Sequence, residues 1–251
     1  MAKATAMSAI GVASMVVAWV LLRVFDLVPE ASLPWPTEVA AAFPRLFRDD
    51  GFRQGMLDTL GAWLLAVAIT SVVGVAVGLL VSTTPGLTRP SAVAVNAFRS
   101  IPATALIPLA ILVFGLGTSM KVAVAVYAVF WPVLINTVYG VVSTEPMRLD
   151  AARSLQWPWW RRQVFVILPS ALPSIVTGLR LAVGTSLVVV ISAELLGARS
   201  GVGTVLVAYQ QALAPEVVYA GTIVVGLFGL ALYTLMVQAE ARFITWVPRN
   251  G

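Results

Sequence analysis

Cysteine and histidine are both absent from this chain, and their absence removes several kinds of chemistry. Without cysteine there is no disulfide, no thiolate metal site and no cysteine nucleophile. Without histidine there is no serine–histidine catalytic pair, no histidine-containing zinc motif and no histidine proton relay. Most schemes for a hydrolase embedded in a membrane therefore fail, and we predict no catalytic residue and no metal site.

Charge is also scarce. Only 11% of the 251 residues are charged and 59% are hydrophobic, with a mean hydropathy of +0.94. A soluble domain carries about a quarter charged residues, because its surface faces water. Much of this surface must face lipid instead. We assign the formal net charge of +5 to basic residues in cytoplasmic loops, so nucleic acid is not an expected partner.

Five stretches without Asp, Glu, Lys or Arg have the length that a bilayer requires, which is roughly 20 apolar helical residues. They are residues 4–22, 59–88, 100–120, 122–144 and 217–239. A sixth span is expected at 174–196, where only Arg180 and Glu194 interrupt the run. The runs are continuous and lack two-residue alternation, which favours helices over strands. We therefore predict an all-α, polytopic transmembrane bundle of about six helices.

The orientation of the bundle is predicted from its basic residues. The first hydrophobic run resembles a signal peptide, but it extends to Leu22 without a convincing cleavage site before Pro34, so we expect a retained helix. With the N-terminus inside, nine basic residues are cytoplasmic and six exterior, which places both termini in the cytoplasm. The cytoplasmic set is Lys3, Arg89, Arg99, Arg148, Arg153, Arg161, Arg162, Arg242 and Arg249; the exterior set is Arg23, Arg45, Arg48, Arg53, Lys121 and Arg199. Residues 38–57 alternate apolar and charged side chains, which predicts a helix lying in the exterior membrane interface.

The long polar stretch of the cytoplasmic side runs from residue 145 to residue 173. Residues 150–155 predict a short helix with Asp150 near its N-terminus, where the helix dipole favours an acidic group. Ala151 and Ala152 make one face small, so another protein could approach closely. Tryptophans and arginines follow, a combination that is typical of membrane and protein interfaces. The residues alone also allow an ordinary amphipathic helix anchored by a tryptophan belt.

This stretch resembles the cytoplasmic signature of the permeases of binding-protein-dependent ABC importers. The signature is Glu-Ala-Ala, three residues, Gly, nine residues, Ile, one residue, and Leu-Pro. Here Asp150-Ala-Ala occupies the first three positions. Gln156, Val166 and Leu168-Pro169 stand at the Gly, Ile and Leu-Pro positions, with the spacing of the pattern unchanged. Asp for Glu and Val for Ile are mild changes. Gln156 is the real departure, because glycine permits backbone angles that glutamine rarely adopts.

The resemblance extends over roughly residues 58–240. In this region the sequence resembles the branch of the family that imports nitrate, taurine and alkanesulfonates. The resemblance rests on four further segments in the expected order. They are 99–109 continuing to 114–117, then 177–180, 193–195 and 201–203. The resemblance implies a type I ABC importer permease fold and a single permease domain over residues 1–251, with a coupling loop at 143–173.

For the mechanism, the resemblance implies that the loop docks on a separate cytoplasmic ABC ATPase subunit. Asp150, Ala151, Ala152, Arg153 and Gln156 would form the docking turn, and Val166, Leu168 and Pro169 would tie it to the fifth span. ATP and Mg would be held by the ATPase. The chain has no glycine-lysine phosphate loop, so we expect it to bind no ATP or other cofactor itself.

The resemblance also implies three further partners in a bacterial inner membrane. An extracytoplasmic solute-binding protein would deliver the solute, and membrane lipid would surround the bundle. A second permease chain would complete the path. A homodimer is the simpler expectation, with a sister permease as the alternative.

Polar residues inside the spans are candidates for the translocation path, because burying them in lipid is costly. The candidates are Arg180, Glu194, Asn136, Asn96 and Ser192. Arg180 would suit an anionic solute. In the alternative interpretation, the Arg180 side chain extends to the cytoplasmic interface and Glu194 caps an exterior loop. Uncharged polar residues also commonly join helices.

An ion-coupled secondary transporter is the alternative function. Such a protein needs intramembrane carboxylates or histidines and usually has repeated halves. Glu194 is the one acidic residue within a predicted span, and no repeat is visible. A membrane enzyme is weaker still, because the sequence has no cluster of carboxylates at metal-binding spacing.

Overall fold

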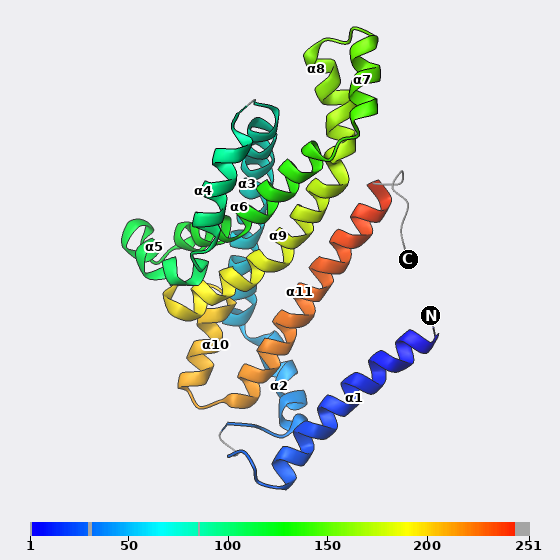
Figure 1. Cartoon of the computed structure of the whole chain (residues 1–251). Helices are drawn as coiled ribbons and strands as arrows, with labels where there is room; N and C mark the ends of the chain where they lie inside the picture. Colours follow the sequence, from blue (N-terminus) through cyan, green and yellow to red (C-terminus); the bar gives the residue numbers. More distant parts are fainter. Residues whose placement is uncertain (1, 30–31, 85, 244–251) are drawn as a thin grey trace.

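The computed structural model describes residues 2–29, 32–84 and 86–243, and each regular element within these ranges is helical (Figure 1). The long helices are α1 (Ala2–Val24), α3 (Asp50–Thr83), α6 (Thr118–Val142), α9 (Leu168–Gly197) and α11 (Pro215–Phe243). The shorter helices are α2 (Pro36–Arg48), α4 (Thr88–Arg99), α5 (Ile107–Phe114), α7 (Pro146–Ser154), α8 (Trp159–Arg162) and α10 (Val202–Gln211). A 3-10 turn at Ala103–Leu106 precedes α5, and a π-helical turn at Gln163–Ile167 joins α8 to α9.

Helices α3, α6 and α9 pack along their lengths and hold the core of the bundle. Lipid supplies no hydrophobic force between helices, so close packing has to hold them together, and small residues permit it. A Cβ added at Gly178 of α9 would lie 2.9 Å from the Cβ of Asn136 on α6. One added at Gly140 of α6 would lie 2.8 Å from the carbonyl oxygen of Ala171 on α9. These two contacts leave no room for a larger residue at either glycine.

The predicted spans are confirmed in kind, but the count of six is not. Four described helical segments are long and apolar enough to cross a membrane: Asp50–Thr83, Thr118–Val142, Trp159–Gly197 and Pro215–Arg242. A fifth arises if the bent pair Pro90–Arg99 and Ala103–Phe114 is one span. The apolar helical stretch Ile10–Val24 of α1 is shorter than these.

The span predicted at 100–120 is interrupted rather than continuous. Helix α4 ends at Arg99, and the chain bends by 75° before α5. Pro102 has an extended backbone there, and proline has no N–H with which to continue a helix. Gly115 then ends α5 with φ of +72°, a conformation that glycine adopts easily. If there is one span here, it therefore consists of two helices, α4 before the break and α5 after it.

The segment predicted to lie in the interface is divided into two helices. Asp49 separates them and caps α3, its carboxylate accepting a 2.9 Å hydrogen bond from the Gly51 amide. Val39 and Leu46 of α2 are buried with Phe52 of α3 in a cluster that includes Val217 and Ala220 of α11. The apolar face of α2 thus packs on protein, although Phe47 of the same helix is largely exposed.

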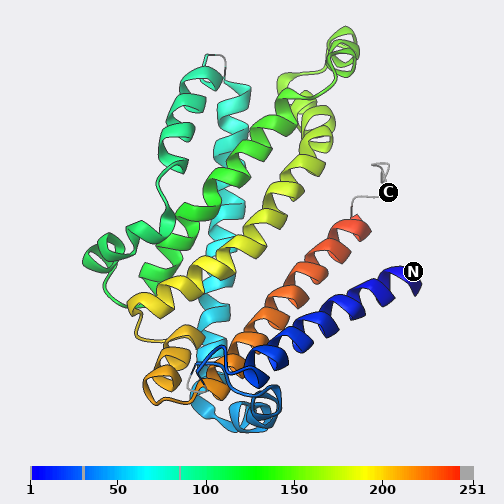
Figure 2. The same cartoon turned by 60° about the horizontal axis from the view of Figure 1, so that its bottom comes forward.

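The two ends of the bundle differ in what they carry. In both views α7 and α8 project beyond one end, and α2 and α10 form the other (Figures 1 and 2). Helix α1 lies beside α11, away from α4 and α6 (Figures 1 and 2). The last residues of α11 lie toward the α7 end. The side chains of Lys3 and Arg89, and all of Arg249, lie outside the described residues.

Two basic residues do not lie where the charge count placed them. Lys121, assigned to the exterior loops, has a fully buried side chain. Arg99, assigned to the cytoplasmic loops, lies at the break after α4. The Tyr127 hydroxyl donates a 2.5 Å hydrogen bond to the carbonyl of Phe98, which places this break beside the middle of α6. A count of loop charges could not detect either position, because both residues border uncharged runs.

Candidate functional site

Helix α7 contains Asp150, Ala151 and Ala152 of the signature, and the turn that follows it explains the glycine of the pattern. The amide of Gln156 donates to the carbonyl of Arg153 at 2.8 Å, and the amide of Trp157 donates to that of Ala152 at 3.1 Å. This pair of bonds is a Schellman motif, which needs a left-handed residue just past the helix. Gln156 takes that position with φ of +54°. The turn therefore forms with glutamine in the glycine place.

A cavity of about 400 Å³ lies between α7 and the start of α9. It joins the two halves of the predicted segment, because Ala151 and Ala152 face Val166 and Pro169 across it. The further lining residues are Arg148, Leu155, Trp157, Phe165 and Ser170. Leu168 points to another side, toward Leu79 and Leu80 of α3. Four of the signature residues, Ala151, Ala152, Val166 and Pro169, therefore line one cavity.

Helix α7 exposes one large apolar side chain at each of its ends and a charged pair along its side. Met147 is 74% exposed and Leu155 is 67% exposed. Asp150 pairs with Arg153 at 2.9 Å, and both side chains are mostly in solvent. A surface ion pair of this kind contributes little stability. The arrangement leaves two large apolar side chains and a charged pair available to another protein.

The tryptophans that follow α7 have two different positions. The ring of Trp157 packs edge-on against Phe165 at 6.4 Å between centroids, and the Arg161 guanidinium lies over the Trp157 ring, 5.4 Å from its centroid. These contacts hold the hairpin together. Trp159 and Trp160 are more than half exposed, as expected of side chains at a membrane interface.

At the opposite end of the bundle, Glu194 is the centre of a buried polar cluster. Its carboxylate pairs with Lys121 Nζ at 2.9 Å, and both side chains are completely buried. It also accepts hydrogen bonds from Thr59 Oγ1 at 2.9 Å and from the Gly203 amide at 3.0 Å. Lys121 donates in addition to the Ser200 carbonyl at 3.0 Å. We call Thr59, Lys121, Glu194 and Gly203 the Glu194 cluster; it joins α3, α6, α9 and α10.

Glycine is required where the chain passes the Glu194 cluster. Gly201 has φ of +120°, and a Cβ there would lie 2.0 Å from the Glu194 side chain. The residue after it, Val202, donates its amide to Thr59 Oγ1 at 2.9 Å. The Gly-Val-Gly segment is therefore shaped around a carboxylate. Sequence reasoning missed Lys121 as the partner, although a single lysine between two long uncharged runs was a usable signal.

Beside the Glu194 cluster, a second acidic residue affects a tyrosine outside the membrane spans. Tyr209 of α10 donates a 2.5 Å hydrogen bond to the carboxylate of Asp49. This hydrogen bond, with burial and the negative charge of Asp49 adding to it, raises the pKa of Tyr209 to about 12. The contact ties α10 to the start of α3.

The structure does not bring the other path candidates together. Arg180 of α9 forms an ion pair with Glu240 of α11, and both are partly buried. The Asn136 amide donates to the Pro132 carbonyl at 2.8 Å within its own helix. Ser192 bonds to the Val188 carbonyl at 2.8 Å in the same way.

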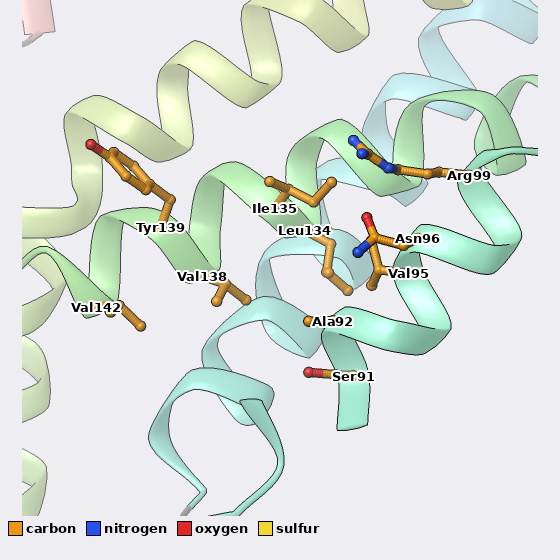
Figure 3. A pocket seen from close by; sticks show the side chains of 10 residues that line it. All are labelled: Ser91, Ala92, Val95, Asn96, Arg99, Leu134, Ile135, Val138, Tyr139 and Val142. Atoms are coloured by element: carbon orange, nitrogen blue, oxygen red, sulfur yellow. The ribbon is translucent and has the colours of Figure 1, made fainter. Parts of the chain in front are cut away.

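Asn96 has a different setting, in an open groove between α4 and α6 (Figure 3). The groove has a volume of about 450 Å³ and follows α6 from Leu134 to Val142, its last residue. Arg99, which was not among the predicted path residues, lies one turn beyond Asn96 on the same face of α4 (Figure 3). We call this feature the α4–α6 groove.

The chain thus belongs to the class of helical integral membrane proteins, with a broken span and a projecting helical hairpin. Comparison with known proteins gives the family. Residues 71–245 match the family described as "Binding-protein-dependent transport system inner membrane component", and the chain belongs to it. It is therefore a transmembrane permease subunit of an ABC importer.

Relatives and solved structures agree with this assignment. The chain is 31% identical over 235 residues to the taurine transport system permease protein TauC of Escherichia coli (strain K12), covering 91% of this chain and 85% of the relative. A Bacillus subtilis (strain 168) permease protein named for aliphatic sulfonates transport is 27% identical over 91% of this chain and 83% of its own length. The fold resembles an inward-facing structure of the MetNI methionine ABC transporter, with a TM-score of 0.60 and 21% identity over 74% of this chain and 94% of that one.

Proposed function

We propose that this permease carries a small anionic solute, such as taurine or another sulfonate, and that α7 couples it to a separate cytoplasmic ABC ATPase subunit. The exposure of Met147 and Leu155 at the two ends of α7 carries the proposal. These two apolar side chains would cost free energy in water, and protein contact would remove that cost. Asp150, Ala151, Ala152, Arg153 and Gln156 would form the surface that the ATPase meets.

The remaining motif residues would connect this surface to the membrane. Val166 and Pro169 line the cavity behind α7, and Leu168 begins α9. A displacement of α7 would therefore reach α9 directly. ATP and Mg would be bound by the ATPase, and this chain would bind no cofactor.

The proposed assembly has two permease chains, because each chain carries one α7 and two ATPase subunits would have to be engaged. Two identical chains are the simplest arrangement. An extracytoplasmic solute-binding protein would deliver the solute at the end formed by α2 and α10. In a bacterial inner membrane both termini would then be cytoplasmic, and residues 1–251 would act as one permease domain with its coupling loop at 143–173.

An ion-coupled secondary transporter is less well supported by the geometry. Such a protein would need an intramembrane carboxylate free to bind an ion or a proton. Glu194 is held by Lys121, Thr59 and the Gly203 amide in a closed set of contacts. Its charge is already neutralised by the lysine. We propose that Glu194 acts in holding the bundle rather than in contacting solute.

The test is purification of the tagged chain from native membranes in a mild detergent, with partners identified by mass spectrometry. A stoichiometric ATPase subunit is expected with the unaltered chain. It should be lost when Asp150 and Ala151 are both changed to Lys. The matched control changes Gln210 and Gln211, exposed at the opposite end, to Lys and should retain the ATPase. Absence of any ATPase, also in a lipid-preserving extraction, would refute the coupling role of α7.

A further inference from the structure

The α4–α6 groove combines an apolar wall with one uncompensated charge. Ten residues line it, and Arg99 is the one charged residue among them. Leu134, Ile135 and Val138 of α6 form the apolar wall opposite α4 (Figure 3). Its volume of about 450 Å³ lies in the range of small-molecule sites. The groove is therefore large enough for a small organic ion and has a single charge with which to attract it.

Among the described residues Arg99 has no partner, in contrast to the arginines that form ion pairs. Arg180 pairs with Glu240, and in the projecting hairpin Arg148 and Arg153 pair with Glu145 and Asp150. Within residues 2–29, 32–84 and 86–243, no carboxylate pairs with Arg99 and no hydrogen bond involves its guanidinium. Its side chain is exposed in the groove. An arginine at membrane depth is costly, so an unpaired one calls for a negatively charged partner.

The position of Arg99 along the bundle agrees with this reading. The Tyr127 hydroxyl bonds to the carbonyl of Phe98, so Arg99 lies near the middle of α6 rather than at a loop. Trp131 of α6 stacks on Phe98 with 5.9 Å between ring centroids. Its indole nitrogen is buried and has no acceptor, although buried indole N–H groups usually find one. Trp131 does not line the groove, but its unpaired indole lies in the same region of α6 as the break after α4.

From these observations we propose that the α4–α6 groove binds one small organic anion. The Arg99 guanidinium would hold the oxyanion end, a sulfonate or a carboxylate, through two parallel hydrogen bonds. The Asn96 amide would donate a further one, and the apolar end would lie on Leu134 and Val138. This inference rests on the proposed function, because it assigns the contact residues for the solute proposed there.

Other occupants fit the groove less well. A second copy of the chain would set the same residues against one another in a two-fold interface, and none of the lining residues is acidic. It would bring a second Arg99 and no counter-charge. An anionic lipid headgroup has suitable chemistry but belongs at the membrane surface, whereas Arg99 lies beside the middle of α6. A soluble anion that enters the membrane through a path fits both the charge and the depth.

Direct binding tests the site without relying on transport. The permease–ATPase complex is placed in nanodiscs of phosphatidylcholine and titrated with trifluoromethanesulfonate, observed by fluorine NMR line broadening. Trifluoroethanol serves as the neutral probe. We expect Arg99→Gln to raise the Kd of the sulfonate at least tenfold and Arg99→Lys to have an intermediate effect. Arg242→Gln, which removes an exposed arginine at the end of α11, should leave the Kd unchanged.

Three outcomes would overturn the proposal. The first is equal broadening in the Arg99 variants and the unaltered complex, and the second is no broadening in any of them. The third is an Arg99-dependent effect on trifluoroethanol that matches the effect on the sulfonate. Nanodiscs that contain phosphatidylglycerol identify the lipid alternative. If Arg99→Gln releases that lipid while sulfonate binding is unchanged, Arg99 is a lipid contact and the solute site is refuted.

Transport measurements separate this inference from the function on which it rests. Proteoliposomes with the ATPase and the solute-binding protein are assayed for ATP-driven uptake of labelled taurine and ethanesulfonate. Uptake by the unaltered complex that is equally rapid in Arg99→Gln refutes the groove alone. No uptake of any sulfonate by the unaltered complex, while ATP is hydrolysed, refutes the proposed solute.

Discussion

The two ends of this bundle are stabilised in opposite ways. At the α2–α10 end, four helices meet at the Glu194 cluster, where every charge is buried and paired. At the other end, the ion pairs of α7 lie in solvent and the apolar side chains of Met147 and Leu155 are largely exposed. The first arrangement fixes helices relative to one another. The second suits a surface that is completed by another protein, so rigidity and recognition are separated by the length of the membrane.

The largest effect is expected from breaking the Glu194 cluster. Lys121→Met leaves Glu194 as an unpaired buried charge, which typically costs about 3–5 kcal/mol. Glu194→Gln leaves Lys121 in the same position. We expect either variant to lower the thermal transition of the detergent-solubilised chain strongly, measured by size-exclusion after heating.

The control for this prediction is the double variant. Lys121→Met combined with Glu194→Gln removes both charges, so it should be more stable than either single variant. Such non-additivity is the signature of a direct pair. If the two single losses simply add, the ion pair contributes no coupling and the contrast between the two ends would need another cause.

An intermediate effect is expected at the turn after α7. Gln156→Gly removes the cost of a left-handed backbone at a residue with a side chain, about 1–2 kcal/mol, offset in part by the greater freedom of glycine in the unfolded chain. We expect slower amide exchange at Trp157, whose N–H closes the turn, with ATPase binding retained. Gln156→Val should have the opposite effect. Faster exchange in the glycine variant would mean that the Gln156 side chain itself stabilises the turn.

The smallest effect concerns Tyr209 at the fixed end. Because its pKa is about 12 in the folded chain and near 10 in an unfolded one, the folded state holds this proton more tightly. The stabilising contribution is present below pH 10 and is lost as the pH rises from 10 through 12. Absorbance of tyrosinate should show one late-titrating residue, absent in Tyr209→Phe. Retention of that late step in Asp49→Asn would show that Asp49 is not its cause.

The helical membrane architecture could be predicted, because a bilayer demands long apolar runs and these are visible without any partner. The short helix in the 145–173 segment was predictable for a similar reason, since the signature that indicates it lies within one short stretch. The Lys121–Glu194 pair was not, because 73 residues separate its members and only packing brings them together. Nor was the 75° break before α5, where the uncharged run continues across the bend. The position of Arg99 beside the middle of α6 follows from that break, so it could not be predicted either.

One long helical segment connects the two ends that have been contrasted. From Trp159 to Gly197 the chain is helical without interruption, over 39 residues. At 1.5 Å per residue this is a rod of roughly 58 Å. Near one terminus it carries the π-helical turn at Gln163–Ile167, and near the other it carries Glu194. Because α9 packs along α6 over its length, a push at the α7 end would move the helix as a whole, and the π-helical turn is the place where the hairpin could flex relative to it.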